Sequence, residues 1–161
     1  MDMLIRGFRS TPLPGLLWRL RQGWLALFRP FRLGVRTLVT DEAGRILLVR
    51  HSYRPGWHFP GGGVKKWETL PEAAIRETEE EAGVRIRRLD RLVGVYANFG
   101  IGYCDHVALF TASDWHPAAG ESLEIAEVRF FSPDQVPADA SPPTQRRLGE
   151  VLGGKPADTH W

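Results

Sequence analysis

The chain has 161 residues, of which 43% are apolar and 25% charged, enough for one well-buried domain and short for two. Its 21 basic and 19 acidic residues give a net charge of +2, and its single cysteine, Cys104, excludes an intramolecular disulfide. We therefore expect one domain in a cytoplasmic setting. The chain contains no run of 18 uninterrupted apolar residues, which excludes a membrane span.

Residues 1–30 are predicted to be an N-terminal amphipathic extension. Residues 1–40 hold seven Arg and one acid, a charge of +6, so the rest of the chain holds −4. Apolar side chains recur there at helical spacing: Leu13, Leu16, Leu17, Leu20, Trp24, Leu27, Phe28 and Phe31. Three interpretations stay open: packing on the parent domain or on a second copy in a homodimer, lying on an anionic membrane surface, and targeting. We favour packing, because an apolar helical stripe is most often buried.

A strand hairpin is predicted next. Alternating apolar residues at 35–39 and an apolar run at 46–49 flank a turn at 41–44. The loop that follows is crowded with the side chains of Arg50, Tyr53 and Arg54. If this loop overhangs a site, its cations and aromatic ring could meet phosphate and a base. A solvent-facing basic loop is an equally weighted alternative.

A helix is predicted from residue 69, shortly after the glycine run 61–63. Thr69 followed three residues later by Glu72 is a capping box, in which each residue satisfies a backbone N–H of the other. Pro71 suits the first turn, where its missing N–H costs nothing. Gly83 supplies the stop.

Three carboxylates share one side of this helix. At about 100° per residue, Glu77, Glu80 and Glu81 fall within an arc of about 100°, whereas Glu79 points away. Like charges at this spacing repel by about 0.2–0.5 kcal/mol per pair. A hard divalent cation such as Mg²⁺ or Mn²⁺ would reverse that sign. The alternative is a solvated acidic face, which is the usual fate of a run of Glu.

Further strands and helices are expected after the acidic helix. The strands are predicted at residues 85–97, 105–112 and 127–131. Residues 132–135 have the sequence of a second capping box, and 143–152 form a plausible final helix. Residues 154–161 are expected to be a loose tail. Strands before and after one central helix, with a late helix, predict an α/β fold with a mixed sheet between helical layers.

Other chemistries lack their motifs. The five histidines show neither HExxH spacing nor nearby cysteines, which argues against a zinc site. The glycine run lacks the Gly-Lys-Ser/Thr ending of a P-loop. No recognised nucleic-acid-binding module accompanies the basic N-terminus, so we expect no specific nucleic-acid partner.

Gly62, Glu68 and the run 76–84 together resemble the Nudix box, the signature of hydrolases acting on a nucleoside diphosphate linked to another moiety. Every fixed polar and glycine position of this 23-residue pattern is filled. Thr78 departs from it, because it stands where Ile, Leu or Val is usual. Trp67 also stands where many members have Gly, which could alter the mouth of the site.

The resemblance implies an enzyme with a Nudix-type α/β/α sandwich over residues 31–153. It implies a Mg²⁺- or Mn²⁺-dependent hydrolase that cleaves a pyrophosphate linkage in a small nucleotide substrate by water attack at phosphorus. The implied alternatives are a non-catalytic nucleotide sensor and, through the amphipathic N-terminus, a hydrolase of isoprenoid or lipid diphosphates at a membrane surface. Residues 98–100, about fifteen positions beyond the box, lack the proline associated with ADP-ribose hydrolases.

The resemblance also implies roles for single residues. It implies that Glu77, Glu80 and Glu81 are catalytic and bind the metal. A further metal ligand from a later loop is common in the family. Our first candidate for it is Glu124, followed by Glu127 and then Glu121. Glu68 and Arg76 look like a pair that braces the glycine loop against the helix. The residues predicted to bind substrate are Arg50, Tyr53, Arg54, Gly61 and Gly62.

Overall fold

The computed structural model of the chain describes residues 31–100, 103–120 and 122–161. The N-terminal helix predicted over residues 1–30 lies outside these described residues, as does Glu121. Within them, no helix has both the length and the hydropathy that a membrane span requires.

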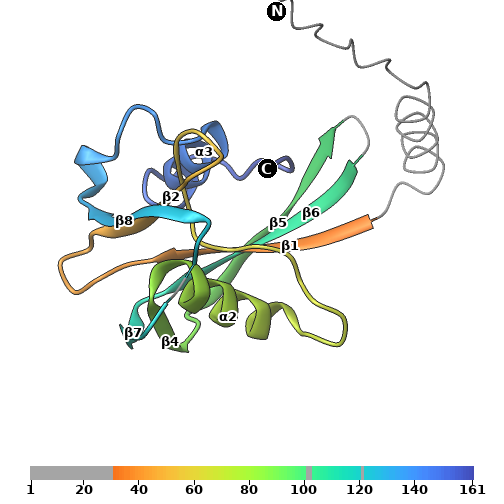
Figure 1. Cartoon of the computed structure of the whole chain (residues 1–161). Helices are drawn as coiled ribbons and strands as arrows, with labels where there is room; N and C mark the ends of the chain where they lie inside the picture. Colours follow the sequence, from red (N-terminus) through yellow and green to blue (C-terminus); the bar gives the residue numbers. More distant parts are fainter. Residues whose placement is uncertain (1–30, 101–102, 121) are drawn as a thin grey trace, which may run out of the picture.

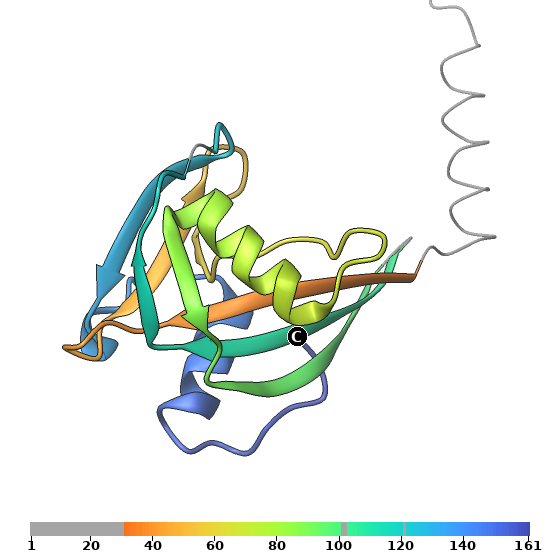
Figure 2. The same ribbon diagram turned by 90° about the horizontal axis from the view of Figure 1, so that it is seen from below.

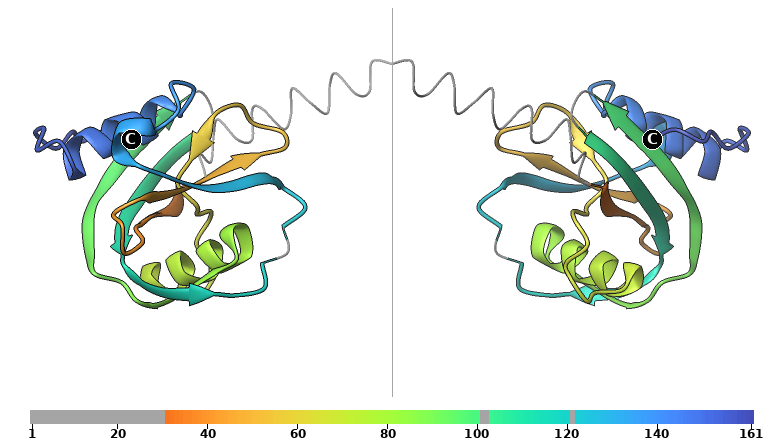
Figure 3. Two further views of the ribbon diagram at one scale, coloured as in Figure 1. Left: turned by 90° about the vertical axis from the view of Figure 1, so that its left-hand side faces the viewer. Right: turned by 90° about the vertical axis from the view of Figure 1, so that its right-hand side faces the viewer.

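A mixed three-stranded sheet lies at the centre of the fold. β1 (Phe31–Val39) runs parallel to β6 (Tyr103–Ala112), and β5 (Arg91–Gly100) pairs antiparallel with the other side of β6. Helix α2 (Leu70–Ala82) covers one face of this sheet and helix α3 (Pro142–Val151) the other, as Figures 1 and 3 show. The predicted α/β architecture, a mixed sheet between helical layers, is therefore confirmed.

Two antiparallel sheets complete the strands. β2 (Ile46–His51) pairs with β3 (Trp57–His58) and β8 (Ile125–Phe131), and β4 (Val84–Arg88) pairs with β7 (Asp114–Pro117). The hairpin predicted from 35–39 and 46–49 is wrong. β6 pairs with one edge of β1, and residues 60–64 bond to its other edge. β1 and β2 therefore belong to different sheets, and the bridge between Thr40 and Ile46 is isolated.

Helix α2 begins and ends where the sequence predicts. Thr69 Oγ1 accepts a hydrogen bond from Glu72 N, and Glu72 Oε2 accepts one from Thr69 N at 2.8 Å, which completes the capping box. Gly83 ends the helix in the left-handed conformation with a φ of 63°. Thr78 is buried and donates to Ala74 O at 2.7 Å, so its hydroxyl is satisfied within the helix. Figure 2 shows α2 lying across β1.

The glycine run lies against the free edge of β1. Val35 N donates to Gly62 O, and Val64 N donates to Leu33 O, both at 2.9 Å. Gly61 has a φ of 143°, and a Cβ there would come within 2.2 Å of Val35 O, so only glycine fits. These bonds bring the glycine backbone beside the helix that follows it.

Three later elements differ from the prediction. The strand predicted at 85–97 is two strands, β4 and β5. β4 pairs with β7 and β5 pairs with β6. The change of partner occurs near Asp90, whose N–H donates to Thr111 O at 2.8 Å. The short helix expected at 132–135 is a 3₁₀ turn, Pro133–Gln135, in which Ser132 makes no side-chain cap. The final helix α3 begins one residue early, with Ser141 as its cap.

The C-terminal tail is held in place. Trp161 N donates to Ala97 O and Ala97 N donates to Thr159 O, both at 2.8 Å, so residues 159–161 bond to β5. The Trp161 ring packs against the buried Tyr96 ring with the centroids 5.7 Å apart. Because these contacts oppose the freedom of a chain end, the expectation of a loose tail at 154–161 is wrong for its last three residues.

Candidate active site

A cavity of about 630 Å³ lies where α2, the glycine run, β1 and the loops before β3 and β8 meet. We call it the carboxylate cavity, after its charged lining side chains: Arg36, Arg54, Glu77, Glu80, Glu81 and Glu124. Four of the five residues predicted to bind substrate also line it: Tyr53, Arg54, Gly61 and Gly62. The structure thus brings the three helix carboxylates, the later-loop carboxylate and most of the predicted substrate-binding residues together.

Glu81 has a strongly perturbed carboxyl group. Burial, assisted by the charges of Glu77 and Glu124, raises the pKa of Glu81 to about 7. The N–H of Gly61, which donates to Glu81 Oε2 at 2.8 Å, and the charge of Arg36 oppose this rise. In the absence of a cation, the carboxyl group is therefore divided between its charged and neutral forms near pH 7.

The other two helix carboxylates lie against the glycine run and an arginine. A Cβ on Gly62 would come within 2.5 Å of Glu77 Oε2, so the missing side chain lets this carboxylate approach. Glu77 Oε1 accepts from Arg76 Nη1 at 2.6 Å. Glu80 is half exposed and lies 3.1 Å from Arg76 Nη1 and 3.6 Å from Lys65 Nζ. Arg76 therefore contacts two of the three predicted metal ligands.

Glu68 and Arg76 make the contact that was predicted for them. Arg76 Nε donates to Glu68 Oε1 at 2.6 Å and Nη2 donates to Oε2 at 2.8 Å, a bidentate pair. The guanidinium lowers the pKa of Glu68 to about 2, and Glu68 raises the pKa of Arg76. Arg76 also donates to Gly63 O at 3.2 Å, and Glu68 accepts from Lys65 N at 2.8 Å. The pair ties α2 to the loop that precedes it.

A second loop brings Glu124 to the cavity. Tyr53 OH donates to Glu124 Oε2 at 3.0 Å, and Ser52 N donates to Glu124 O at 2.8 Å. The hydrogen bond to Glu124 raises the pKa of Tyr53. The loops that precede β3 and β8 are therefore fastened to each other at the rim of the site.

Arg50 does not line the carboxylate cavity. Its side chain pairs with Glu127 across β2 and β8 and lies over the Trp57 ring, 5.3 Å from the centroid. Successive side chains on a strand face opposite sides, and here His51 faces the cavity. Glu127, the runner-up for the further ligand, is also absent from the lining. The structure therefore places Arg50 outside the lining of this cavity.

Two lining residues with titratable side chains, Arg36 and His51, were not predicted as site residues. Arg36 donates to the carbonyl oxygens of Phe59 and Gly61, and burial lowers its pKa against the opposing charge of Glu81. The His51 ring is buried and has no hydrogen-bond partner among the described residues, and burial lowers its pKa. A charged residue inside the apolar strand 35–39 is the sequence signal that could have identified Arg36.

The donor set fits a hard divalent cation. Four carboxylates line one cavity, and Mg²⁺ and Mn²⁺ prefer carboxylate and water oxygens. Across the described ranges, no three His, Cys, Asp or Glu side chains are yet gathered closely enough to hold a metal ion. Glu77 and Glu80 instead contact Arg76. Glu80 is half exposed, so its side chain can turn toward a cation without unpacking the core.

Known proteins match most of this chain. The NUDIX domain family matches residues 30–152. A protein of Bacillus subtilis (strain 168), provisionally named as an 8-oxo-dGTP diphosphatase, is 31% identical over 121 residues, which cover 75% of this chain and 80% of that protein. A MutT-like protein of Streptomyces ambofaciens is 33% identical over 121 residues, which cover 74% of this chain and 76% of its own.

The likeness extends to a solved structure. The crystal structure of a MutT NUDIX hydrolase from Burkholderia pseudomallei superimposes with a TM-score of 0.68 at 26% identity. The match covers 76% of this chain and 99% of that one. The predicted fold with its mixed sheet is therefore shared well beyond the 23-residue motif.

Proposed function

The chain belongs to the NUDIX family and is a pyrophosphohydrolase, and we propose that its substrate is a nucleoside triphosphate of the 8-oxo-dGTP type. The observation that carries this proposal is the carboxylate cavity, where four carboxylates lie beside two arginines and the glycine backbone. Carboxylates hold the metal ion, and cationic side chains and glycine-rich backbone hold phosphate oxygens. The similarity to the Bacillus subtilis protein favours a nucleoside triphosphate over other linked diphosphates.

We assign the binding of Mg²⁺ or Mn²⁺ to Glu77, Glu80, Glu81 and Glu124. When bound, the cation supplies neutralising charge at the phosphate oxygens and a lower pKa for a bound water molecule. Arg76 keeps Glu77 and Glu80 near the cavity, and Glu68 in turn fixes Arg76. Glu68 and Arg76 therefore act as positioning residues.

The remaining lining groups bind and orient the polyphosphate. Arg36 is already fixed by two backbone carbonyls, so its guanidinium loses little freedom when phosphate oxygens bind. Arg54 supplies a second cation at the same cavity. The water oxygen bonds to phosphorus as the bridging P–O bond breaks, and the leaving phosphate keeps the bridging oxygen with the electron pair of that bond. A cavity carboxylate accepts the water proton.

The test is the substitution Glu81→Gln. It keeps the size of the side chain and removes its charge, so we expect kcat to fall by at least about a hundredfold. The measurement is pyrophosphate and phosphate release from 8-oxo-dGTP and the common deoxynucleoside triphosphates, and AMP formation from ADP-ribose. Each substrate is assayed with Mg²⁺ and with Mn²⁺.

Glu79→Gln is the matched control, because it makes the same change on the same helix. Glu79 pairs with Arg85, whose Nε lies 2.7 Å from Glu79 Oε2, and it does not line the carboxylate cavity. We expect this variant to retain nearly full activity. Turnover by Glu81→Gln equal to that of the control would sink the assignment of the site, and a wild-type chain that hydrolyses no nucleotide would sink the proposed substrate.

A further inference from the structure

Three exposed aromatic residues lie at one end of the molecule. Phe31 at the start of β1, Phe99 near the end of β5 and Trp67 in the loop before α2 are 64%, 56% and 92% exposed. The start of β1, the end of β5 and this loop lie at the same end in Figures 1 and 2. Exposed apolar side chains that gather at one place mark a surface that binds a partner or a membrane.

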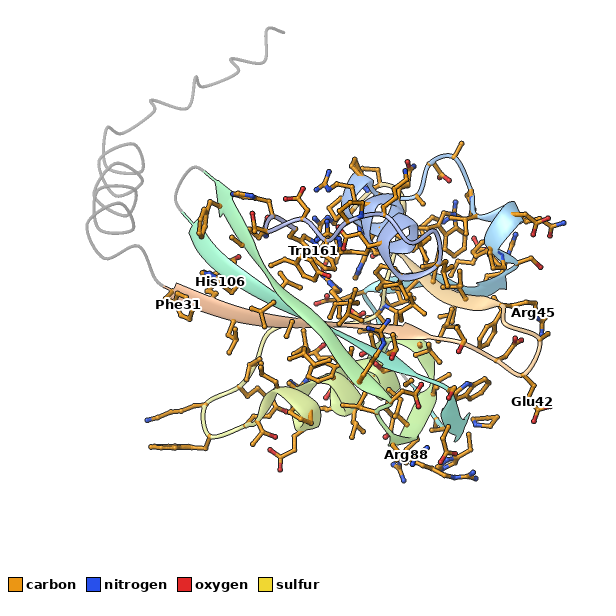
Figure 4. The ribbon with its side chains drawn as sticks, turned by 180° about the vertical axis from the view of Figure 1, so that it is seen from behind. Phe31, Glu42, Arg45, Arg88, His106 and Trp161 are labelled. Carbon is orange, nitrogen blue, oxygen red and sulfur yellow. The ribbon has the colours of Figure 1, made fainter. Side chains whose placement is uncertain are left out.

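Two of these residues lie on the face of the sheet that α2 covers. Phe31 and Phe99 are both register partners of Cys104 on β6. The His106 ring contacts both of their rings, with centroid distances of 5.2 Å to Phe31 and 5.6 Å to Phe99, and Figure 4 shows Phe31 beside His106. Val35, four residues after Phe31 and on the same face, is buried against α2. The part of this face that α2 leaves uncovered is therefore aromatic.

The loop with Trp67 runs beside the first residues of β1. Val64 N donates to Leu33 O at 2.9 Å. Residues 65–68 then form a turn, in which the N–H of the last residue donates to the carbonyl oxygen of the first at 3.2 Å, with Lys66 and Trp67 at the tip. Trp67 has a φ of 66°, although its side chain is not buried by the domain. A strained residue with an exposed ring indicates a function outside the packing of the domain.

The loop also presents two cations beside the aromatic residues. Lys65 and Lys66 are exposed, and Lys65 Nζ lies 3.6 Å from Glu80 while its side chain stays 63% exposed. The carboxylates of Glu68 and Glu72 are already hydrogen-bonded, to Arg76 and within the capping box. We call the five residues of this surface the aromatic–basic patch: Phe31, Lys65, Lys66, Trp67 and Phe99.

The basic N-terminal extension leads directly into this patch. Residues 1–30 precede Phe31 and hold five Arg and one Asp. On the helix that the sequence predicts there, Arg19 and Arg21 fall about 100° to either side of Leu20, so that cations border the apolar stripe. An apolar stripe bordered by cations is typical of a helix that lies on an anionic membrane surface.

Charge decides between the possible partners of the patch. The apolar stripe alone favours packing of the extension on the domain, but the extension and the patch are both positive, so their charges oppose that contact. One anionic partner attracts both. Nucleic acid would satisfy the cations and stack on the rings, yet it offers the leucines of the extension no apolar surface, whereas a lipid bilayer does.

We propose that the aromatic–basic patch and the N-terminal extension together dock this protein on the surface of an anionic lipid bilayer. Phe31, Trp67 and Phe99 enter the headgroup region, where aromatic rings are favoured, and Lys65 and Lys66 contact lipid phosphates. No patch residue lines the carboxylate cavity, so docking leaves this cavity free to bind a substrate from solution.

The first test is flotation of the full chain with phosphatidylcholine vesicles that contain or lack phosphatidylserine. We expect the wild-type chain to bind only the anionic vesicles. Lys66→Glu should weaken this binding by about tenfold or more, because a cation near the surface becomes an anion. Arg88→Glu is the control, because it makes the same charge change on β4, at an exposed residue that Figure 4 shows away from Phe31.

Arg88→Glu should weaken the binding by less than about twofold. If the wild-type chain binds neither kind of vesicle, the proposal is wrong. Equal losses in Lys66→Glu and Arg88→Glu would also overturn it, because the vesicles would then attract the whole molecule rather than the patch.

The aromatic residues are tested by Trp67→Ser and Phe99→Ser. Each should weaken binding to the anionic vesicles by about fivefold or more, because less apolar surface enters the bilayer. Leu152→Ser is the control: this residue is 49% exposed at the end of α3, on the other side of the sheet, and we expect no loss. Thermal melting reports whether each variant is folded. Full affinity in folded Trp67→Ser and Phe99→Ser proteins would overturn the proposal.

Other partners of the patch give different results. Leu20→Asp in the full chain should weaken vesicle binding and leave the melting temperature in lipid-free solution unchanged. A lower melting temperature would show that the extension packs on the domain instead. A dimer in sedimentation that Phe99→Ser dissociates would assign the patch to a second copy. An oligonucleotide that binds more tightly than the vesicles, and less tightly to Trp67→Ser, would assign it to nucleic acid. Each of these three results would refute membrane docking.

Discussion

Two buried histidines lie beside the carboxylate cavity. The rings of His51 and His58 meet edge to face with the centroids 5.5 Å apart, and His58 Nε2 lies 2.9 Å from Pro55 O. Burial, together with the positive charges of Arg54 and Arg36, lowers the pKa of His58 to about 4. The ordinary pKa of His is about 6.5. The lower value in the folded state means that folding favours the neutral His58 ring over the charged one.

This difference predicts how stability depends on pH. Above pH 6.5 His58 is neutral in both states and the free energy of unfolding is at its full value. Between pH 6.5 and 4 the unfolded chain binds the proton first, so stability falls by about 3 kcal/mol from this residue. We expect His58→Gln to flatten that part of the curve, measured by urea unfolding at pH 7.5, 5.5 and 4.5.

His116→Gln is the control for the pH experiment. His116 lies on β7, away from the pair, so its substitution should keep the wild-type slope. The pKa of His51 is also lowered, so His58→Gln should reduce the slope without abolishing it. A slope as steep as that of the wild-type chain would show that His58 does not resist protonation in the folded state.

Arg36 and Arg50 illustrate which parts of the site could be predicted from the sequence and which could not. The helix carboxylates could be predicted because helical periodicity alone places them on one side. The side that Arg50 faces could not be predicted, because it depends on the partners that β2 acquires from distant segments. Arg36 has a local signal, a charge inside an apolar strand, but its place at the site depends on the glycine run that lies along the edge of that strand.

At the scale of elements, the loop before α2 contains a residue in an unfavourable backbone conformation. Trp67 has a φ of 66°, in the left-handed region that costs an L-residue about 1–2 kcal/mol. Trp67 is 92% exposed, so the packing of its side chain offsets little of this cost. Many members of the family have Gly at this position, and glycine is the residue that adopts this conformation without strain.

The prediction compares Trp67→Gly with Trp67→Ala. Both remove the ring and its contact with Lys66, but only Gly relieves the backbone, so Gly should be more stable than Ala by about 1 kcal/mol. The measurement is urea unfolding at pH 7.5. At the neighbouring Lys66, which has an ordinary φ, the order should reverse, because Gly there only adds freedom to the unfolded chain. If Trp67→Ala is as stable to urea as Trp67→Gly, or more stable, the backbone at position 67 is not strained.

Elements with local signals could be predicted, and pairings between distant segments could not. Helix α2 follows the capping box at Thr69 and the stop at Gly83, both of which act within a few residues. The pairing of β1 with β6 joins Phe31 to Cys104, and nothing near either strand specifies that partner. The predicted hairpin failed because it assumed that neighbours in sequence pair.

At the scale of the whole molecule, one buried arginine joins three distant segments. The Arg147 side chain on α3 is 0% exposed and lies over the Tyr96 ring of β5, with its Cζ 4.0 Å from the centroid. Its Nη1 donates to His160 O at 3.0 Å in the C-terminal tail, and its Nη2 lies 2.8 Å from Glu150 Oε1. Helix, sheet and tail therefore depend on one guanidinium.

Arg147→Met should lower the free energy of unfolding by about 3 kcal/mol or more, because the change leaves the Glu150 carboxylate, which is 8% exposed, without its cationic partner. Arg146→Met is the control: Arg146 is exposed and its bond to the Trp161 carbonyl lies at the surface, so we expect a loss below about 1 kcal/mol. Adding Glu150→Gln to Arg147→Met removes the stranded charge but keeps an acceptor for Tyr96, and should restore part of the loss. If urea unfolding finds the two arginine variants equally stable, Arg147 does not hold the three segments together.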